Sequence, residues 1–181
     1  MANVQRRASM STYQIKRLEA AMVDGRTHNH FFRQAQLERL CKCILAKETL
    51  LRDAMISDSE YTPHEAIAVL HASLQAVKQC YASLQPKQAL EDEYRVARGV
   101  DAIDNEVPVG MVYIEADTHT LLYSICSPLC AAIAAGSCVV LLVSPTLIVL
   151  SAILLTLLAA GKQSPQASCA HSANPNRCFG C

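Results

Sequence analysis

The pattern of apolar and polar positions changes abruptly at Thr120. From Thr120 to Gly161 the chain contains no Asp, Glu, Lys, Arg or His. Apolar surface on this scale gains nothing from contact with water, so the run belongs either in a lipid bilayer or in an α/β sheet covered on both faces. Deciding between these two environments decides the class of function.

Before this run, apolar residues recur with helical spacing. The positions at i, i+3, i+4, i+7 and i+8 are Leu37, Leu40, Cys41, Ile44 and Leu45. Charged residues, among them Arg33 and Lys42, lie largely between them, which predicts an amphipathic helix that continues to Met55. A shorter helix is predicted over residues 12–23, because Asp24-Gly25 would end it.

A second long helix is predicted to begin at Pro63. Thr62 supplies an N-cap hydroxyl, Pro63 occupies the first helical position and Glu65 completes a capping box. The predicted buried stripe reaches Pro86 and consists of Leu70, Leu74, Val77, Tyr81 and Leu84. His64 and His71 are interpreted as surface histidines of this helix, and residues 87–106 as a charged connector.

The chain from residue 107 onward predicts one βαβ unit and therefore an α/β fold. Val107–Ile114 is a proline-containing entry to a short apolar strand. Ser127-Pro128 predicts the start of a small-residue helix, Leu129–Ala135, which Gly136 ends. Cys138–Val143 is a continuous apolar run that includes three β-branched valines, typical of a fully buried parallel strand.

Composition narrows the classes of partner and compartment. The 16 basic and 16 acidic side chains cancel, so no global field favours nucleic acid, and we expect no nucleic-acid partner. Nine cysteines without an Asn-x-Ser/Thr acceptor or a signal peptide indicate a reducing, cytoplasmic location with free thiols. Cys126 and Cys130 share a helix face like ordinary core residues, and we predict no metal site.

These elements, in this order, resemble the N-terminal part of an aldehyde dehydrogenase, most closely the fatty aldehyde dehydrogenase branch. The likeness spans about residues 15–160 and is carried by Gly25-Arg26-Thr27, residues 34–45, the helix after Pro63, Pro108–Val112 and above all Ser127–Leu141. The resemblance implies N-terminal helices followed by an incomplete Rossmann-like βαβ unit. It divides the chain into a disordered N-terminus (1–11), an aldehyde dehydrogenase-like segment (12–160) and a disordered Cys/Ser-rich tail (161–181).

Two family motifs differ at the positions that carry chemistry. The family's Pro-Trp-Asn, whose asparagine amide donates to the oxyanion, corresponds to Asp117-Thr118-His119, which puts His119 at the asparagine position. The family's Lys-Pro-Ser-Glu, which holds the ribose of NAD(P), corresponds to residues 142–145, which puts Leu142 and Ser144 at the lysine and serine positions. The family implies NAD(P), but with these residues we expect no catalytic residue and no bound cofactor.

The family's catalytic cysteine and general-base glutamate would follow residue 160, where the tail shows no family likeness. The resemblance therefore implies a truncated aldehyde dehydrogenase-like protein, which we expect to be catalytically inactive. Such a protein would be accessory to a pathway that oxidises aliphatic or aromatic aldehydes, as a homo-oligomer or a hetero-oligomer with a full-length family member.

An alternative interpretation uses residues 138–160 as a membrane anchor without enzymatic activity. The 14 Leu, Ile and Val residues of this segment contribute roughly −4 to −8 kcal/mol to insertion, which favours a transmembrane helix. However, Ser144-Pro145-Thr146 interrupts the run and leaves only Leu147–Ala160, whereas a span needs about 20 residues. Both a cytoplasmic and a membrane-associated location therefore stay open.

Overall fold

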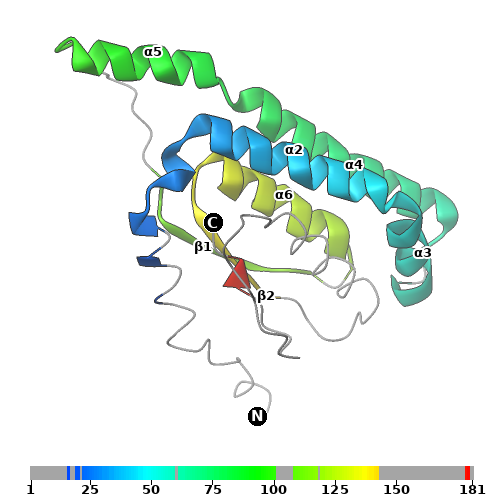
Figure 1. Ribbon diagram of the computed structural model, residues 1–181. Coiled ribbons are helices and arrows are strands. Elements are labelled where there is room, and N and C mark those ends of the chain that lie inside the picture. Colours follow the sequence, from blue (N-terminus) through cyan, green and yellow to red (C-terminus); the bar gives the residue numbers. More distant parts are fainter. Residues whose placement is uncertain are drawn as a thin grey trace.

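The computed structural model describes residues 16, 19–20, 22–59, 61–100, 108–117, 119–142 and 178–179. The elements follow in this order: η1 (Arg26–His28), α2 (His30–Ala46), α3 (Glu48–Ser59), α4 (Pro63–Ser83), α5 (Pro86–Ala97), β1 (Met111–Glu115), α6 (Leu121–Ala134), β2 (Cys138–Leu142) and β3 (Cys178–Phe179) (Figure 1). Helices come first and a strand–helix–strand unit follows, which confirms the predicted α/β class.

The sheet contains the predicted parallel pair. β1 pairs with β2 in a register that sets Met111 opposite Cys138 and Glu115 opposite Leu142. The short β3 pairs antiparallel with β2, so the strand order is β1-β2-β3 and β1 lies at an edge of the described sheet. Because β1 and β2 run in the same direction, their carboxyl ends meet at one end of the sheet.

The folded part is built in layers, with α6 between the strands and the pair α2 and α4 (Figure 1). One continuous core joins these layers, and its fully or nearly fully buried members include Leu37, Ile44, Leu70, Val77, Leu122, Ile125, Ile114 and Val139. Helix α4 makes its most extensive contacts with α6. The hydrophobic stripes read from the sequence therefore meet around α6, as the period of about 3.6 residues requires.

The uncharged run begins in the interior of this fold. Its first part forms α6 and β2, in which Leu121, Leu122 and Cys138–Leu141 are buried. The predicted membrane segment 138–160 is therefore wrong for Cys138–Leu142, because these residues pair with β1 in a sheet. Residues 143–160 lie outside the described residues. In the described ranges, no helix combines the length and the apolar character needed to cross a membrane.

The helix predicted to continue to Met55 is instead two helices. α2 ends at Ala46, and Lys47 has φ −118° and ψ 23°, away from helical values. α3 then takes a new direction that buries Leu51 and Met55 in the core next to α4. The apolar spacing continues through the bend, which is why periodicity alone predicted one helix.

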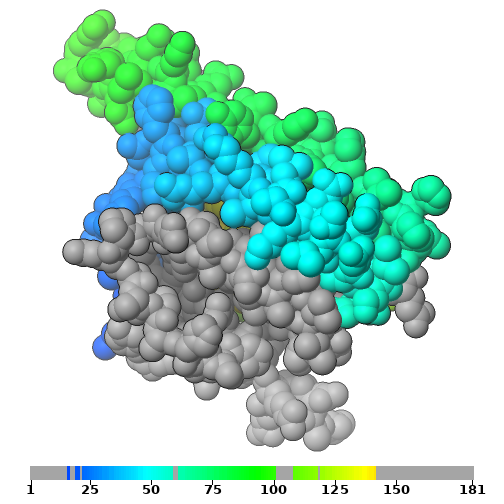
Figure 2. All heavy atoms as spheres, turned by 45° about the vertical axis from the view of Figure 1, so that its right-hand side comes forward, coloured from blue at the N-terminus to red at the C-terminus, as the bar shows by residue number. Residues whose placement is uncertain are grey.

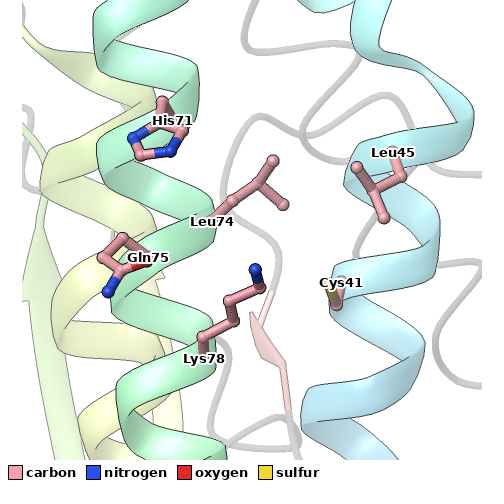
Figure 3. A pocket seen from close by; sticks show the side chains of 6 residues that line it. All are labelled: Cys41, Leu45, His71, Leu74, Gln75 and Lys78. Atoms are coloured by element: carbon pink, nitrogen blue, oxygen red, sulfur yellow. The ribbon is translucent and has the colours of Figure 1, made fainter.

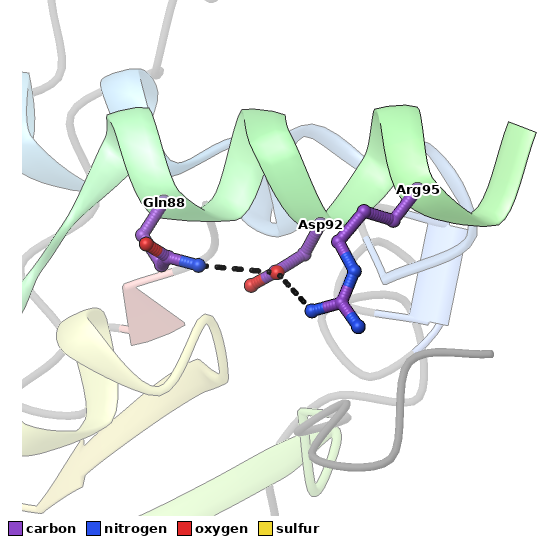
Figure 4. Close-up of polar contacts among 3 residues, drawn as sticks. All are labelled: Gln88, Asp92 and Arg95. Atoms are coloured by element: carbon purple, nitrogen blue, oxygen red, sulfur yellow. Dashed lines mark hydrogen bonds and ion pairs between the residues drawn. The ribbon is translucent and has the colours of Figure 1, made fainter. Parts of the chain in front are cut away.

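The predicted connector 87–106 begins with a helix, α5, and that part of the prediction is wrong. Its polar side chains pair along one side: Gln88 Nε2 donates to Asp92 Oδ1 at 3.2 Å, and Arg95 Nη1 lies 3.8 Å from the same oxygen (Figure 4). All residues of α5 are described and none is buried. The helix projects from the body of the molecule (Figures 1 and 2). The many charged residues led to the interpretation as a connector, whereas polar residues four positions apart can pair and stabilise an exposed helix.

The other boundaries differ more modestly. α6 begins at Leu121, not after Pro128, and it contains this proline because Leu121, Leu122 and Ile125 are buried one turn and more before it. β1 begins at Met111, four residues later than predicted. Of the predicted helix 12–23, residues 16, 19–20 and 22–23 are described and helical. The predicted disordered segments 1–11 and 161–181 lie outside the described residues, except 178–179.

Candidate functional site

The candidate site is the end of the sheet where β1 leads into α6 and where β2 stops. In parallel α/β sheets, ligands bind outside the carboxyl ends of the strands. Here that end consists of Glu115, the loop of residues 116–120 and Leu142. The register places Glu115 opposite Leu142, so the structure brings two of the sequence-predicted positions, His119 and Leu142, to the same end of the sheet.

His119 lies exposed, directly before Thr120, the N-cap residue of α6. Its backbone N–H donates to Asp117 Oδ1 at 3.5 Å, and its carbonyl accepts a hydrogen bond from the Tyr61 hydroxyl. Ser124 Oγ donates to the Asp117 carbonyl at 3.3 Å. The loop backbone is therefore held from both sides, while the position predicted to carry the oxyanion donor faces solvent. Thr118 lies outside the described residues.

Tyr61 belongs to the start of α4, where the predicted capping box is confirmed. The Thr62 N–H donates to Glu65 Oε2 at 2.9 Å, and the Glu65 N–H donates to Thr62 Oγ1 at 3.4 Å. These bonds satisfy amides that the first helical turn leaves without partners. The Tyr61–His119 bond therefore joins the N-terminal ends of α4 and α6 across 58 residues of sequence.

Carboxylates dominate the electrostatics of this end of the sheet. Burial raises the pKa of the Tyr61 hydroxyl, and the nearby carboxylates of Glu65 and Asp117 raise that pKa further. Glu115 adds a third exposed carboxylate at the end of β1. The sequence from Pro108 to Leu142 contains no Lys or Arg. The loop between β1 and α6 therefore carries carboxylates and, in its sequence, neither Lys nor Arg.

Leu142 ends β2, and the structure describes nothing further of the second motif. Val143, Ser144 and Pro145 lie outside the described residues, so the predicted serine position has no structural counterpart here. Among the residues that the structure does describe, no group of three or more His, Cys, Asp or Glu is arranged to hold a metal ion.

The thiols with resolved pKa shifts are protonated. Burial raises the pKa of Cys126 to about 12, and burial together with neighbouring thiols raises the pKa of Cys130. Burial also raises the pKa of Cys80. Cys126 and Cys130 are both buried in α6, as predicted from their shared face. Since the thiolate is the nucleophile, these three cysteines are unsuited to attack a carbonyl at neutral pH.

Arg33 is the residue that the sequence interpretation missed. It was placed on the polar side of its helix, but it is buried, with Nε donating to the Thr27 carbonyl and Nη1 donating to the Ala134 carbonyl at 3.0 Å. Burial lowers the pKa of its guanidinium. It satisfies a carbonyl at the C-terminal end of α6, just before β2. Its spacing of four residues from Leu37, on the buried stripe, was the signal that could have found it.

A separate hollow of about 150 Å³ lies between α2 and α4. Its lining residues are Cys41, Leu45, His71, Leu74, Gln75 and Lys78, and Figure 3 shows Lys78 extending from α4 toward α2. His71 is exposed at this hollow, which confirms its interpretation as a surface histidine. No residue of the β1–α6 loop lines it, so it is distinct from the candidate site.

Comparisons with known proteins agree with the fold. No protein-family profile matches the chain. A curated protein, aldehyde dehydrogenase family 3 member B1 from Bos taurus, is 30% identical over 133 residues, covering 70% of this chain and 28% of that protein. A solved structure, the substrate-bound state of Staphylococcus aureus AldH, matches with a TM-score of 0.69 at 20% identity, covering 83% of this chain and 34% of that chain.

The chain thus spans about a third or less of the length of the proteins that it matches. The structural match shows the fold, and the curated relative connects 70% of the chain to a named family. The polypeptide is therefore aldehyde dehydrogenase-like, as its motifs predicted.

Proposed function

We propose that this chain is a non-catalytic aldehyde dehydrogenase-like protein that serves aldehyde oxidation as an accessory. The observation that supports the proposal is the β1–α6 loop, which carries His119 at the position that the sequence assigns to the family's amide donor. The exposed carboxylates of Glu115 and Asp117 lie at this end of the sheet, and Glu65 lies near Tyr61. Two requirements of the family's chemistry bear on this end of the sheet: an oxyanion donor and a dinucleotide site.

The oxyanion requirement concerns His119. A donor accelerates acyl chemistry when it is preorganised in a site that excludes water, and loss of one such donor typically costs about a hundredfold or more in rate. The His119 side chain is exposed, and the bond from Tyr61 fixes its carbonyl rather than its ring. An exposed imidazole in this position therefore stabilises an oxyanion only weakly.

The dinucleotide requirement concerns charge. A pyrophosphate is recognised by helix N-termini, backbone amides and cations. The N-terminal end of α6 offers backbone amides to a phosphate, but the carboxylates of Glu115 and Asp117 precede it. Glu65, in the first turn of α4 near Tyr61, adds a third carboxylate. Leu142 offers no donor at the family's lysine position. The described residues therefore do not fit NAD(P), and we expect the chain to bind none.

The proposal is tested with the purified full chain, NAD⁺ or NADP⁺, and hexanal or benzaldehyde, by absorbance at the nicotinamide band. A full-length aldehyde dehydrogenase is the positive control. We expect no turnover above buffer, and we expect His119→Asn to restore none, because the dinucleotide requirement stays unmet. Turnover that scales with protein concentration and falls in His119→Ala would overturn the proposal.

The accessory role is tested by co-expression. A tagged chain should retain a full-length aldehyde dehydrogenase through purification and change its kcat or KM for an aliphatic or aromatic aldehyde. If the enzyme is not retained and its kinetics are unchanged at equimolar concentration, the accessory role is wrong, whatever the outcome of the turnover assay.

Two related predictions have their own tests. We propose a cytoplasmic location, and the alternative is membrane association through the remaining part of the predicted anchor, where residues 147–158 are apolar on all sides. Carbonate extraction of cells separates the two outcomes.

The prediction of a truncated family member is tested by sequencing the transcript beyond the codon for Cys181, where a longer reading frame would contradict it.

A further inference from the structure

The first turn of α2 joins three elements of the fold. The helix begins at His30, directly after Asn29, whose side chain caps it by accepting hydrogen bonds from two backbone amides. Arg33, three residues further on, donates to the Thr27 carbonyl in η1 and to the Ala134 carbonyl at the end of α6. One buried guanidinium therefore holds η1, α2 and α6 together.

This turn already carries more positive than negative charge. The N-terminus of a helix has a partial positive charge, and the first turn of α2 contains no acidic residue that would offset it. Arg33 is only 8% exposed, and the carbonyls that it binds carry no net charge. A second cation beside Arg33 would therefore be repelled in surroundings that screen charge poorly.

His30 is the group that can supply such a charge. Residues three apart in a helix lie on the same face, so the His30 ring is a neighbour of Arg33. The ring is half-buried. Burial and then the charge of Arg33 lower the pKa of His30, while the carboxylate of Glu93 raises it. His30 is therefore neutral at neutral pH and takes up a proton only in acid.

Glu93 lies on α5, which contacts α2. Two other charged side chains of α5, Asp92 and Arg95, are engaged with each other within the helix, with Oδ1 of the first 3.8 Å from Nη1 of the second (Figure 4). Among the charged groups of α5, Glu93 is thus the one that acts on His30 and favours its protonated form.

The other elements around this turn leave the balance of charge unchanged. In η1, Arg26 Nε lies 2.7 Å from Asp24 Oδ2, and His28 is exposed to solvent. Helix α6 contains no charged residue, and neither do residues 79–83 in the last turn of α4. Helix α3 follows the opposite end of α2. Protonation of His30 is therefore opposed by one cation and favoured by one carboxylate.

We propose that His30 is a proton-sensitive switch that keeps η1, α2 and α6 together while its ring is neutral and loosens this junction when the ring is protonated. Protonation places a second positive charge beside Arg33 and at the positive end of α2. The unfolded chain takes up the same proton without this repulsion, so the folded state loses stability as the pH falls. The inference does not depend on whether the chain is catalytic.

The test is urea unfolding of the purified full chain, followed by circular dichroism. Between about pH 7.5 and about pH 5.5, we expect the unfolding equilibrium constant to rise at least about threefold more in the wild type than in His30→Gln. His71→Gln removes a histidine that is exposed on α4 and is the matched control. It should respond to acid as the wild type does.

Glu93→Gln is the second variant, and it decides the case if His30→Gln does not fold. It removes the carboxylate that favours the protonated ring, so its response to acid should exceed that of the wild type. Glu91→Gln makes the same change elsewhere on α5 and should leave the response unchanged. An equal response of His30→Gln and the wild type, a response of Glu93→Gln no larger than that of the wild type, or a reduced response of His71→Gln would overturn the proposal.

Hydrogen exchange locates the effect within the fold. The wild type and His30→Gln are compared at the same pH, so the intrinsic pH dependence of exchange cancels. Residues 133–138, at the junction of α6 and β2, should exchange faster in the wild type at about pH 5.5 and equally in both proteins at about pH 7.5. Equal exchange of this segment at both pH values would contradict the switch.

Discussion

At the scale of single residues, the junction between α6 and β2 depends on the contact between Arg33 and Gly136. Gly136 has φ 76°, a conformation that favours glycine, and a Cβ added there would lie 2.4 Å from Arg33 Nη2. The guanidinium can reach the Ala134 carbonyl only because this position has no side chain. A buried arginine on the second helix thereby fixes where the buried strand begins.

We expect Gly136→Ala to lower the free energy of unfolding by about 2–4 kcal/mol, the sum of a left-handed backbone penalty and overpacking against Arg33. Gly99→Ala is the matched control, because Gly99 has φ 77° but nothing within 4 Å of an added Cβ. The control should cost about 1 kcal/mol. Urea unfolding followed by circular dichroism measures both, and equal costs would contradict the role of Arg33.

Sequence reasoning reached part of this site. It placed His119 and Leu142 at motif positions, and the structure places both at one end of the sheet. Their assignment to the family's motifs stays a prediction. It did not find the Tyr61–His119 bond, because the partners are 58 residues apart and neither motif nor periodicity connects them. It missed the burial of Arg33 because charged residues are seldom buried, although the spacing to Leu37 indicated it.

At the scale of elements, the start of α4 has a stabilising interaction that depends on pH. Hydrogen bonds from the Thr62 hydroxyl and backbone lower the pKa of the Glu65 carboxyl. A carboxyl whose pKa is lower in the folded state contributes stability above its unfolded pKa, and that contribution disappears as pH falls through the folded pKa. The carboxylate's part of the cap should therefore stabilise α4 at neutral pH and be lost in strong acid, while the bond to the Thr62 hydroxyl does not titrate.

We expect Glu65→Gln to be less stable than the wild type at neutral pH, with the difference shrinking as the pH falls below the usual pKa of a glutamate. Glu91→Gln makes the same charge change on the exposed α5 and is the control. Thermal unfolding across a pH series measures this difference. A difference that stays constant through the acid range would contradict the capping role of the carboxylate.

Helix α5 should be the least protected helix of the described fold, because it buries none of its residues. We expect its amides to exchange with solvent faster than those of α4 in native-state hydrogen exchange. Leu70→Ala, in the core, should cost about 2–5 kcal/mol, whereas Leu90→Ala on α5 should cost less than about 1 kcal/mol. Equal protection of α5 and α4 would show that α5 is covered in solution.

The helix boundaries also show which sequence signals were sufficient to predict where a helix begins or ends. The capping box and Gly136 each mark a helix end through local chemistry, and both predictions are confirmed. The start of α6 was predicted too late, because a proline usually marks the first turn of a helix. Here the helix begins at Leu121, before Pro128, and Leu121 and Leu122 are buried. The bend at Lys47 depends on packing of α3 against α4, which no local pattern encodes.

At the scale of the whole molecule, the described fold is a βαβ unit covered on one side by helices, with a carboxylate-rich end where β1 leads into α6. The chain keeps the aldehyde dehydrogenase-like arrangement of helices and strands. We propose that it differs from the family at the β1–α6 loop and at the end of β2. Asp117 and His119 of the loop are exposed and lie outside the core cluster, so the core packing does not depend on their side chains.

The most direct test of this account is isothermal titration of NAD⁺ and NADP⁺ into the purified full chain, with a full-length aldehyde dehydrogenase as the positive control. The account predicts no saturable heat for this chain under conditions where the control saturates. Saturable binding of either dinucleotide with one site per chain would contradict it.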